Sequence, residues 1–446
     1  MKLRLTLALL LLPLPLASAQ APSQDTVRLG ALHASAVQRD PRARELDLLS
    51  AQSRLRQKNF DAEQRPSLSV ESQAQYQSDV PRIPITLPGG VTPPVPPHDT
   101  YDAKLVAQQR LFDATRAPRR AVEDAQVAES QARLRATLFA VRQNVNDAYF
   151  ASLRAQSQLA ELATTITDVE AQLQVAETRV REGSALPSEE LAIRAELLRR
   201  RQSVAELVAS RRASLEVLAD LTGTPLDTLT VLGAPELGAE VARARSELPS
   251  LRARPEYVQF ARARDVLQRQ DEARASQDKP KVSAFGRAGY GRPGLNPLSD
   301  KFDGYWLAGV QLQWTPWNWG TTDRDREVLS LQRQIVSADE QQFTESLRRG
   351  VALDLATIDR LDAVVSSDDD IVSLRERIAA ETRARFGESV VTSAEYVDKQ
   401  TDVLSARISR ALHRVELAQA RARFLTTLGV EVKYCVHIVE LPACCC

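Results

Sequence analysis

The sequence predicts a mostly α-helical chain that also contains a small membrane β-barrel part. Apolar residues recur at alternating steps of three and four over very long stretches, which is typical of coiled-coil helices. Four short segments instead alternate between apolar and polar side chains, which is typical of half-buried strands. These elements occur twice in the same order, so we expect two structural repeats.

The N-terminus has the features of a secretory signal peptide. Two basic residues, Lys2 and Arg4, precede the apolar run Leu5–Leu16, and a small-residue cleavage site ends at Ala19. We therefore expect residues 1–19 to be a signal peptide. A buried N-terminal helix is the alternative, but two prolines within the run would interrupt it.

The composition excludes several classes of protein. Without Lys2 and Arg4 the chain has 56 basic and 58 acidic residues, and this near-balance argues against a nucleic-acid partner. Beyond the leader there is no apolar run of about 18 residues, so the chain is either soluble or enters a membrane by β-strands. Cys435 and Cys444–Cys446 all lie near the C-terminus, so the body of the chain does not rely on disulfides.

Two repeats follow the signal peptide, and we assign residues 20–232 to the first and 233–429 to the second. "RPSLSVESQAQY" (Arg65–Tyr76) matches "KPKVSAFGRAGY" (Lys279–Tyr290), and "LADLTG" in the first repeat matches "FLTTLG" in the second. Residues 430–446 form an atypical, Cys-rich tail to which we assign no function.

Each repeat is expected to contain a helix, two strands, a very long helix and a further helix. In the first long helix a seam from Leu138 to Val180 is apolar except at Ser152, which predicts a coiled coil. The second seam is weaker, because Asp354 and Asp368 fall on it. The expected bounds are a helix at about 40–64, strands at about 66–78 and 100–112, and helices at about 114–182 and 188–221 in the first repeat, then a helix at about 250–277, strands at about 280–291 and 304–316, and helices at about 321–386 and 393–428 in the second.

The strand segments favour a membrane protein over a soluble rod. Their polar faces carry charge, whereas their apolar faces carry small aliphatic residues with aromatic residues at the ends. Trp306 and Trp314 share a face eight residues apart, about 27 Å along a strand, and tilting brings this span close to the apolar band of an outer-membrane barrel. An aromatic cluster in a sandwich core is the alternative. The expected membrane aromatic girdle comprises Tyr76, Tyr101, Tyr290, Trp306, Trp314, Trp317 and Trp319.

Four strands cannot close a barrel by themselves, and open sheet edges are not tolerated in lipid. The barrel must therefore be shared between chains. With its two strand–loop–strand–long-helix copies and the pieces "QQRLFDATRA" and "QLQWTPWNWG" after the strands, the chain resembles the TolC-like outer-membrane efflux protein family. The resemblance covers the mature chain to about Gly429.

The resemblance implies a homotrimer in the outer membrane, with a twelve-stranded barrel and a helical tunnel that extends across the periplasm. It also implies a periplasmic adaptor protein and an inner-membrane pump as partners. The function implied is passive conduction in tripartite efflux or type I secretion, with drugs, metals, polyketides and proteins all open as substrates. A secreted periplasmic or surface coiled-coil structural protein is the alternative.

The breaks "REGSALPSEELAIRAE" and "RFGESVVTSAEYVDKQ" follow the long helices. Gly183 and Gly387 are expected to supply left-handed caps there, and Pro187 suits the start of the next helix. A simple hairpin turn is the minimal interpretation. The resemblance implies that both turns form adaptor-docking tips, made by Gly183, Ser184, Ala185, Leu186, Gly387, Ser389, Val390 and Val391.

Glu395 and Asp398 follow the second turn at a spacing that places them on one helical face. They match family positions at which acidic residues ring a constricted periplasmic entrance. In a trimer each would form a ring of three carboxylates that attracts cations. Ordinary solvated charges on a helix are the alternative.

No enzyme is expected. His33, His98, His413 and His437 are scattered without ligand spacing, and neither a nucleophile motif nor a phosphate-binding loop is present. We therefore expect no catalytic residue, no cofactor and no metal site.

Overall fold

The structure is a computed structural model that describes residues 27–81, 95–388 and 390–430. The expected signal peptide and the tail after residue 430 lie outside these residues. The chain divides into two compact units. The helical unit comprises Met1–Ser35, Val145–Glu236 and Leu361–Gln419, and the sheet unit comprises Ala36–Asn144, Leu237–Arg360 and Ala420–Cys446. Each unit therefore draws on both predicted repeats.

The described residues form eight α-helices, one short 3-10 helix and four strands. The order is α1 (Leu29–Arg39), α2 (Ala43–Ala62), β1 (Ser67–Tyr76), β2 (Asp99–Asp113), α3 (Arg116–Arg181), α4 (Pro187–Thr222), α5 (Gly238–Ser246), η1 (Leu248–Ala253), α6 (Pro255–Ala275), β3 (Lys281–Arg292), β4 (Asp303–Gln313), α7 (Thr321–Gly387) and α8 (Ser393–Leu428). None of the described helices is both long and apolar enough to cross a membrane.

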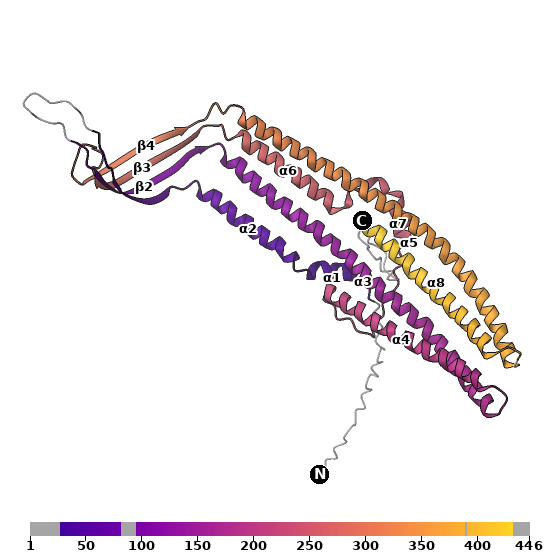
Figure 1. Ribbon diagram of the computed structural model, residues 1–446. Helices are drawn as coiled ribbons and strands as arrows, with labels where there is room; N and C mark the ends of the chain where they lie inside the picture. Colours follow the sequence, from indigo (N-terminus) through magenta and orange to yellow (C-terminus); the bar gives the residue numbers. More distant parts are fainter. Residues whose placement is uncertain (1–26, 82–94, 389, 431–446) are drawn as a thin grey trace, which may run out of the picture. The chain divides into compact units, whose positions relative to one another are not determined.

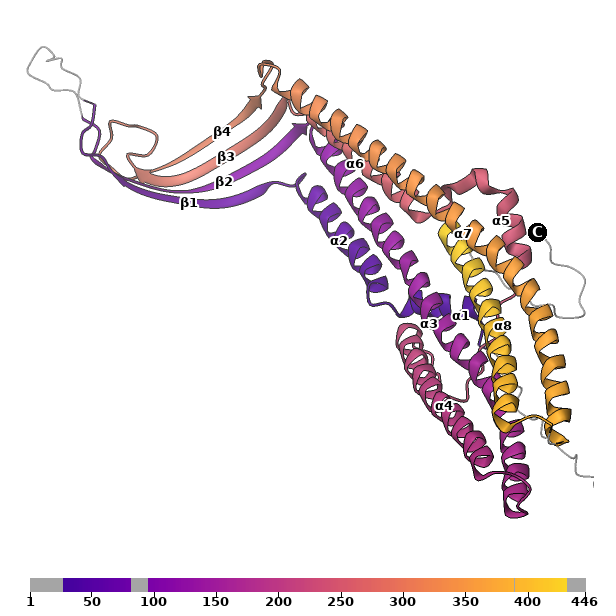
Figure 2. The same cartoon turned by 45° about the vertical axis from the view of Figure 1, so that its right-hand side comes forward.

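The four strands form one antiparallel sheet in the order β1-β2-β3-β4, and they lie side by side in Figure 2. The register aligns the apolar positions in rows: Val70 lies opposite Leu105, Leu105 opposite Ala288, and Ala288 opposite Trp306. Because side chains alternate between faces along a strand, this register places the apolar residues of all four strands on the same face.

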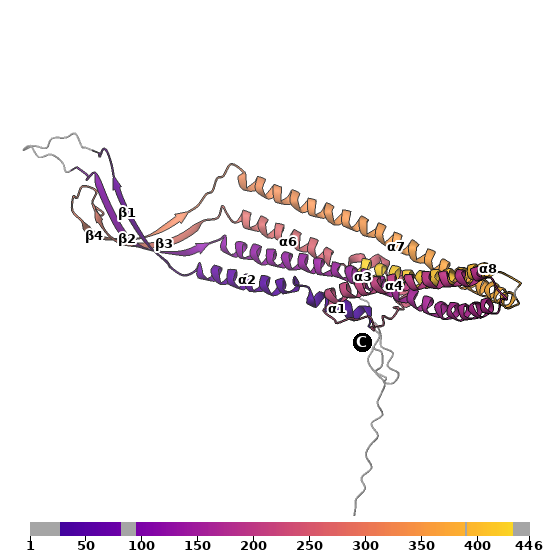
Figure 3. The same ribbon diagram turned by 60° about the horizontal axis from the view of Figure 1, so that its bottom comes forward.

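One helix of the sheet unit joins each strand, in the same order as the strands (Figure 3). α2 precedes β1, α3 follows β2, α6 precedes β3 and α7 follows β4. Ion pairs join neighbouring helices: Arg56 of α2 contacts Glu123 of α3, and Arg326 of α7 lies 2.8 Å from Asp271 of α6. The sheet therefore continues into a layer of helices.

The helical unit contains two long hairpins. α4 runs back along the second part of α3, and α8 runs back along the last part of α7 (Figure 1). The predicted seam of α3 is buried here, and Val145 and Val169 are almost inaccessible. Ser152, the polar exception on the seam, is buried as well.

The two aspartates that weaken the seam of α7 face α8. The Asp354 carboxylate accepts hydrogen bonds from Arg423 Nε at 2.6 Å and Thr427 Oγ1 at 3.0 Å. Asp368 lies 2.7 Å from His413 Nδ1. Both carboxylates are buried, so these partners offset their desolvation cost. The polar interruptions are therefore specific contacts between α7 and α8.

Candidate functional site

The sheet presents one apolar face on which large side chains are exposed. Val70 is 79% exposed and Val310 is 67% exposed. Both are apolar residues within their strands, where a soluble sheet would normally bury such side chains. The large exposed apolar side chains that the register places on this face include Leu68, Val70, Leu105, Phe112, Trp306, Val310 and Leu312. A contiguous apolar surface of this kind marks an interaction surface.

Aromatic residues gather at both ends of this face. At the end of the sheet where loops join β1 to β2 and β3 to β4, the Phe302 ring stacks on Tyr101 and Tyr290, with ring centroids 6.0 and 5.8 Å apart. At the other end Trp314 follows β4 directly, and Trp317 meets Trp319 edge to face at 5.9 Å. All seven aromatic residues of the expected girdle are exposed, or partly exposed in the case of Tyr101 at 43%.

Phe302 is a member of this arrangement that the sequence reasoning missed. The fourth strand is predicted to begin at about residue 304, so Phe302 falls outside it, and in the structure Phe302 lies one residue before β4 begins. The signal was present, because extending the alternation of β4 back from Trp306 places residue 302 on the same face.

In the turn after β4, Trp319 has an uncommon backbone conformation. Trp319 has φ of 57° and is 81% exposed, and the next residue, Gly320, has φ of 70°. The Asn318 side chain holds the turn, because its Oδ1 accepts the Gly320 N–H at 3.1 Å and its Nδ2 donates to Asp278 Oδ2 at 2.8 Å. A bulky residue adopts a positive φ only when its surroundings impose it.

The opposite face of the sheet is polar. Lys104 Nζ lies 3.1 Å from Asp102 and 3.5 Å from Glu71, and the Tyr305 hydroxyl donates to Asp102. The Tyr305 ring covers Gly289, where an added Cβ would lie 2.7 Å from the ring. A charged, hydrogen-bonded face opposite an apolar face is the pattern of a sheet that separates lipid from water.

The first expected tip is the turn between α3 and α4. Gly183 has φ of 71°, and its N–H donates to the Val180 carbonyl at 3.1 Å. The Ser184 N–H donates to the Arg179 carbonyl at 2.9 Å. These two bonds form a Schellman motif, and Gly183 is the left-handed cap that the sequence predicted. Leu186 follows, with its side chain exposed.

The second expected tip is the turn between α7 and α8, and here the predicted cap is wrong. Gly387 is not among the residues with positive φ, and it is the last residue of α7. The Val390 N–H donates to the Arg385 carbonyl at 2.9 Å, so the hydrogen bond that caps the C-terminus of α7 comes from a residue beyond Gly387. This turn contains two more residues than the first, because α8 begins six residues after Gly387 whereas α4 begins four residues after Gly183. The cap therefore lies further along the chain. Ser389 lies outside the described residues.

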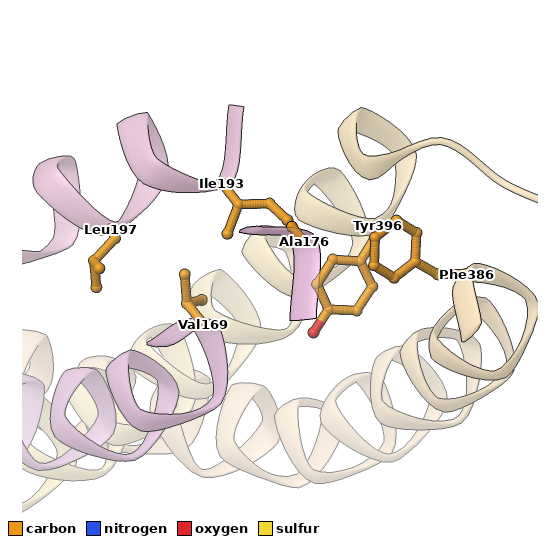
Figure 4. Close-up of a cluster of buried hydrophobic side chains, with 6 residues drawn as sticks. All are labelled: Val169, Ala176, Ile193, Leu197, Phe386 and Tyr396. Atoms are coloured by element: carbon orange, nitrogen blue, oxygen red, sulfur yellow. The ribbon is translucent and has the colours of Figure 1, made fainter. Parts of the chain in front are cut away.

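A hydrophobic cluster joins the two hairpins behind the tips (Figure 4). Phe386 of α7 and Tyr396 of α8 stack with ring centroids 4.9 Å apart. Tyr396 is 1% exposed, and its hydroxyl has no hydrogen-bond partner among the described residues. Burial raises the pKa of the Tyr396 hydroxyl. Val169, Ala176, Ile193 and Leu197 of the α3–α4 hairpin complete the cluster.

Glu395 and Asp398 are both exposed on the first turns of α8. Asp398 Oδ2 lies 2.9 Å from Lys399 Nζ, and this carboxylate raises the pKa of Lys399. The Glu395 N–H donates to Thr392 Oγ1 at 3.2 Å, so T-x-x-E forms one half of a capping box. The sequence analysis did not predict this capping role, although the T-x-x-E spacing of Thr392 and Glu395 indicates it.

The fold of this chain is similar to the folds of several solved outer-membrane channels. At 16% identity the structure is similar to CusC, described as undergoing transmembrane channel formation, with a TM-score of 0.66 over 91% of this chain and 93% of that one. It is similar to VceC of Vibrio cholerae at 13% identity, with a TM-score of 0.63 over 91% and 97%. It is also similar to the Neisseria gonorrhoeae MtrE outer membrane channel at 18% identity, with a TM-score of 0.63 over 91% of this chain and 90% of that one.

Residues 37–224 match the family of outer membrane efflux proteins, whereas no curated protein matches the chain in sequence. This match covers less than half of the chain, and together with the fold it agrees with the resemblance to the outer-membrane efflux proteins. An outer-membrane location with an extension into the periplasm, which the resemblance implies, agrees with this match and with the fold.

Proposed function

We propose that three copies of this chain form an outer-membrane channel that passively conducts substrates delivered by an inner-membrane pump, in a tripartite efflux or type I secretion system. The observation that carries this proposal is the exposed apolar face of the sheet, opposite a charged face. Lipid would cover the first face and water the second. A secreted coiled-coil structural protein would leave the apolar face without a partner.

The sheet edges support a shared barrel. β1 and β4 are the two edge strands, and each pairs on one side only within the described residues. Unpaired backbone groups are costly in lipid, so we propose that β4 of one copy pairs with β1 of the next. Three copies then form twelve strands in a closed ring.

The tips offer exposed apolar side chains to a periplasmic adaptor. Leu186 is exposed in the first turn and Val390 in the second, and both belong to the helical unit. Exposed apolar residues on rigid turns are typical of docking surfaces. We propose that an adaptor hairpin contacts them, together with the backbone of Gly183, Ser184 and Gly387.

Extraction and conductance test the channel proposal. The protein should require detergent, run as a heat-modifiable trimer by native mass analysis, and give stepwise currents in planar bilayers. Release of a monomer by carbonate washing would contradict the proposal. Adaptor docking is tested separately: Leu186→Asp with Val390→Asp should abolish co-purification of the adaptor, whereas Leu229→Asp, at an exposed loop leucine of the same unit, should not.

A further inference from the structure

We propose that Arg287 shifts the charge selectivity of the pore towards anionic substrates, because three copies would form a ring of guanidinium groups without ion-pair partners. This inference rests on the proposed function and adds a substrate class to it. Rings of charged side chains set the selectivity of many pores.

Arg287 lies in the middle of β3 on the polar face of the sheet. The register places it opposite Val106 of β2 and Leu307 of β4. Its neighbours on the same face of its own strand are Phe285 and Gly289. None of these four residues carries a charge, so no carboxylate occupies the nearest positions around the guanidinium group.

The Arg287 side chain is exposed and forms no ion pair with any residue in the described ranges. The neighbouring cation on this face, Lys104, is in contrast compensated, since it contacts both Asp102 and Glu71. Nearer the helices, Arg110 pairs with Glu63 at 2.9 Å. Arg287 is therefore a cation on this face without an ion-pair partner in the described ranges, whereas Lys104 with its two carboxylates has a net charge of −1.

The position of the guanidinium group is supported by packing. Its Cζ lies 5.3 Å from the centre of the Phe285 ring, within the range of a cation–π contact. That ring in turn lies over Gly309 of β4, where an added Cβ would approach it to 2.8 Å. The glycine thus allows the ring to lie against the strand, and the ring provides a surface for Arg287.

The expected effect follows from symmetry and screening. A threefold axis places three Arg287 groups at one height in the pore, whatever the tilt of the strands. The Coulomb interaction of three such charges with an ion, screened at about 0.1 M salt, corresponds to a change of about twofold in the anion-to-cation permeability ratio.

Reversal potentials in a KCl gradient across planar bilayers test the proposal. Arg287→Gln should lower the chloride-to-potassium permeability ratio about twofold, and Arg287→Glu should lower it further. Arg287→Lys should keep the wild-type ratio. Glu71→Gln, which removes a negative charge from the same face, should move the ratio in the opposite direction.

Two other outcomes would overturn the inference, and they are distinguishable. If Arg287→Gln forms channels of wild-type conductance with an unchanged reversal potential, the ring is wrong while the channel function stands. If the wild-type protein forms no channels, the proposed function and the ring both fail.

Discussion

Arg179, near the end of α3, donates a hydrogen bond of 2.8 Å from Nη2 to the carbonyl oxygen of Gly387, the last residue of α7. Its Nη1 donates to the Phe386 carbonyl at 3.2 Å, and its guanidinium group lies 5.5 Å from the centre of the Phe386 ring. Carbonyl groups at a helix C-terminus have no partner within the helix, so a cation there is favourable. One side chain thus ties the two hairpins at their tips.

We expect Arg179→Met to weaken the contact between the α3–α4 hairpin and the end of α7. The variant keeps the apolar stem and loses both hydrogen bonds, which should lower the free energy of unfolding by about 1–3 kcal/mol. Hydrogen exchange should increase at the end of α7 and the start of α8. Arg181→Met is the control, because Arg181 bonds only within its own helix among the described residues. Equal exchange in both variants would contradict the role of Arg179.

The two turn glycines should respond differently to alanine. Gly183→Ala imposes a Cβ on a left-handed residue and should cost about 1–2 kcal/mol of stability. Gly387→Ala should be neutral or stabilise by up to about 1 kcal/mol, because the residue is helical and no atom lies within 4 Å of the added Cβ. Thermal melting of the detergent-solubilised protein measures both. The same loss in both variants would mean that the turns share one cap geometry.

Tyr396→Phe should stabilise the protein and change its response to alkaline pH. The substitution removes a buried hydroxyl without a partner in the described chain, for a gain of about 1 kcal/mol. Because burial raises the pKa of Tyr396 above its usual 10.0, the fold favours the neutral form. The stability from this group is complete below pH 10 and is lost as pH rises through the raised pKa. Unfolding curves between pH 8 and about 12 should therefore fall less steeply for the variant than for the wild type.

Asn318→Ala should release the tryptophan turn. Without the side-chain acceptor for the Gly320 N–H, Trp319 has no reason to keep a positive φ, and both indoles of the turn should move. Quenching of tryptophan fluorescence by brominated lipids should fall by up to about half, since two of the four tryptophans lie in this turn. Asn296→Ala, which removes a bond within the β3–β4 loop, is the control. Unchanged quenching would show that Asn318 does not position the pair.

Glu395→Gln with Asp398→Asn should reduce block of the channel by divalent cations, if the two carboxylates ring the entrance. The single Glu395→Gln change should account for most of the effect, because Asp398 is already paired with Lys399. Gln is also accepted at this position of a capping box, so stability should be preserved. Glu216→Gln, at an exposed residue paired with Arg212, is the control. Identical block in all variants would rule out the ring.

Much of the fold was predictable because its patterns are local. Alternation of two along Leu68–Tyr76 and Trp306–Trp314 identified the strands and their apolar face, since successive side chains on a strand point to opposite sides. The spacing of three and four from Leu138 onward identified the seam of α3, which is buried. The cap at Gly387 was wrong because two inserted residues changed where the helix ends.

The sequence by itself determined which residues share a face, which segments are strands or long helices, and where the aromatic residues concentrate. These properties depend on neighbours along the chain. Only the tertiary structure decided that Arg179 meets Gly387, 208 positions away, that Phe302 stacks on Tyr101 and Tyr290, and that Arg287 lies opposite uncharged neighbours. Such contacts depend on strand register and on how the hairpins pack, and no local pattern specifies either.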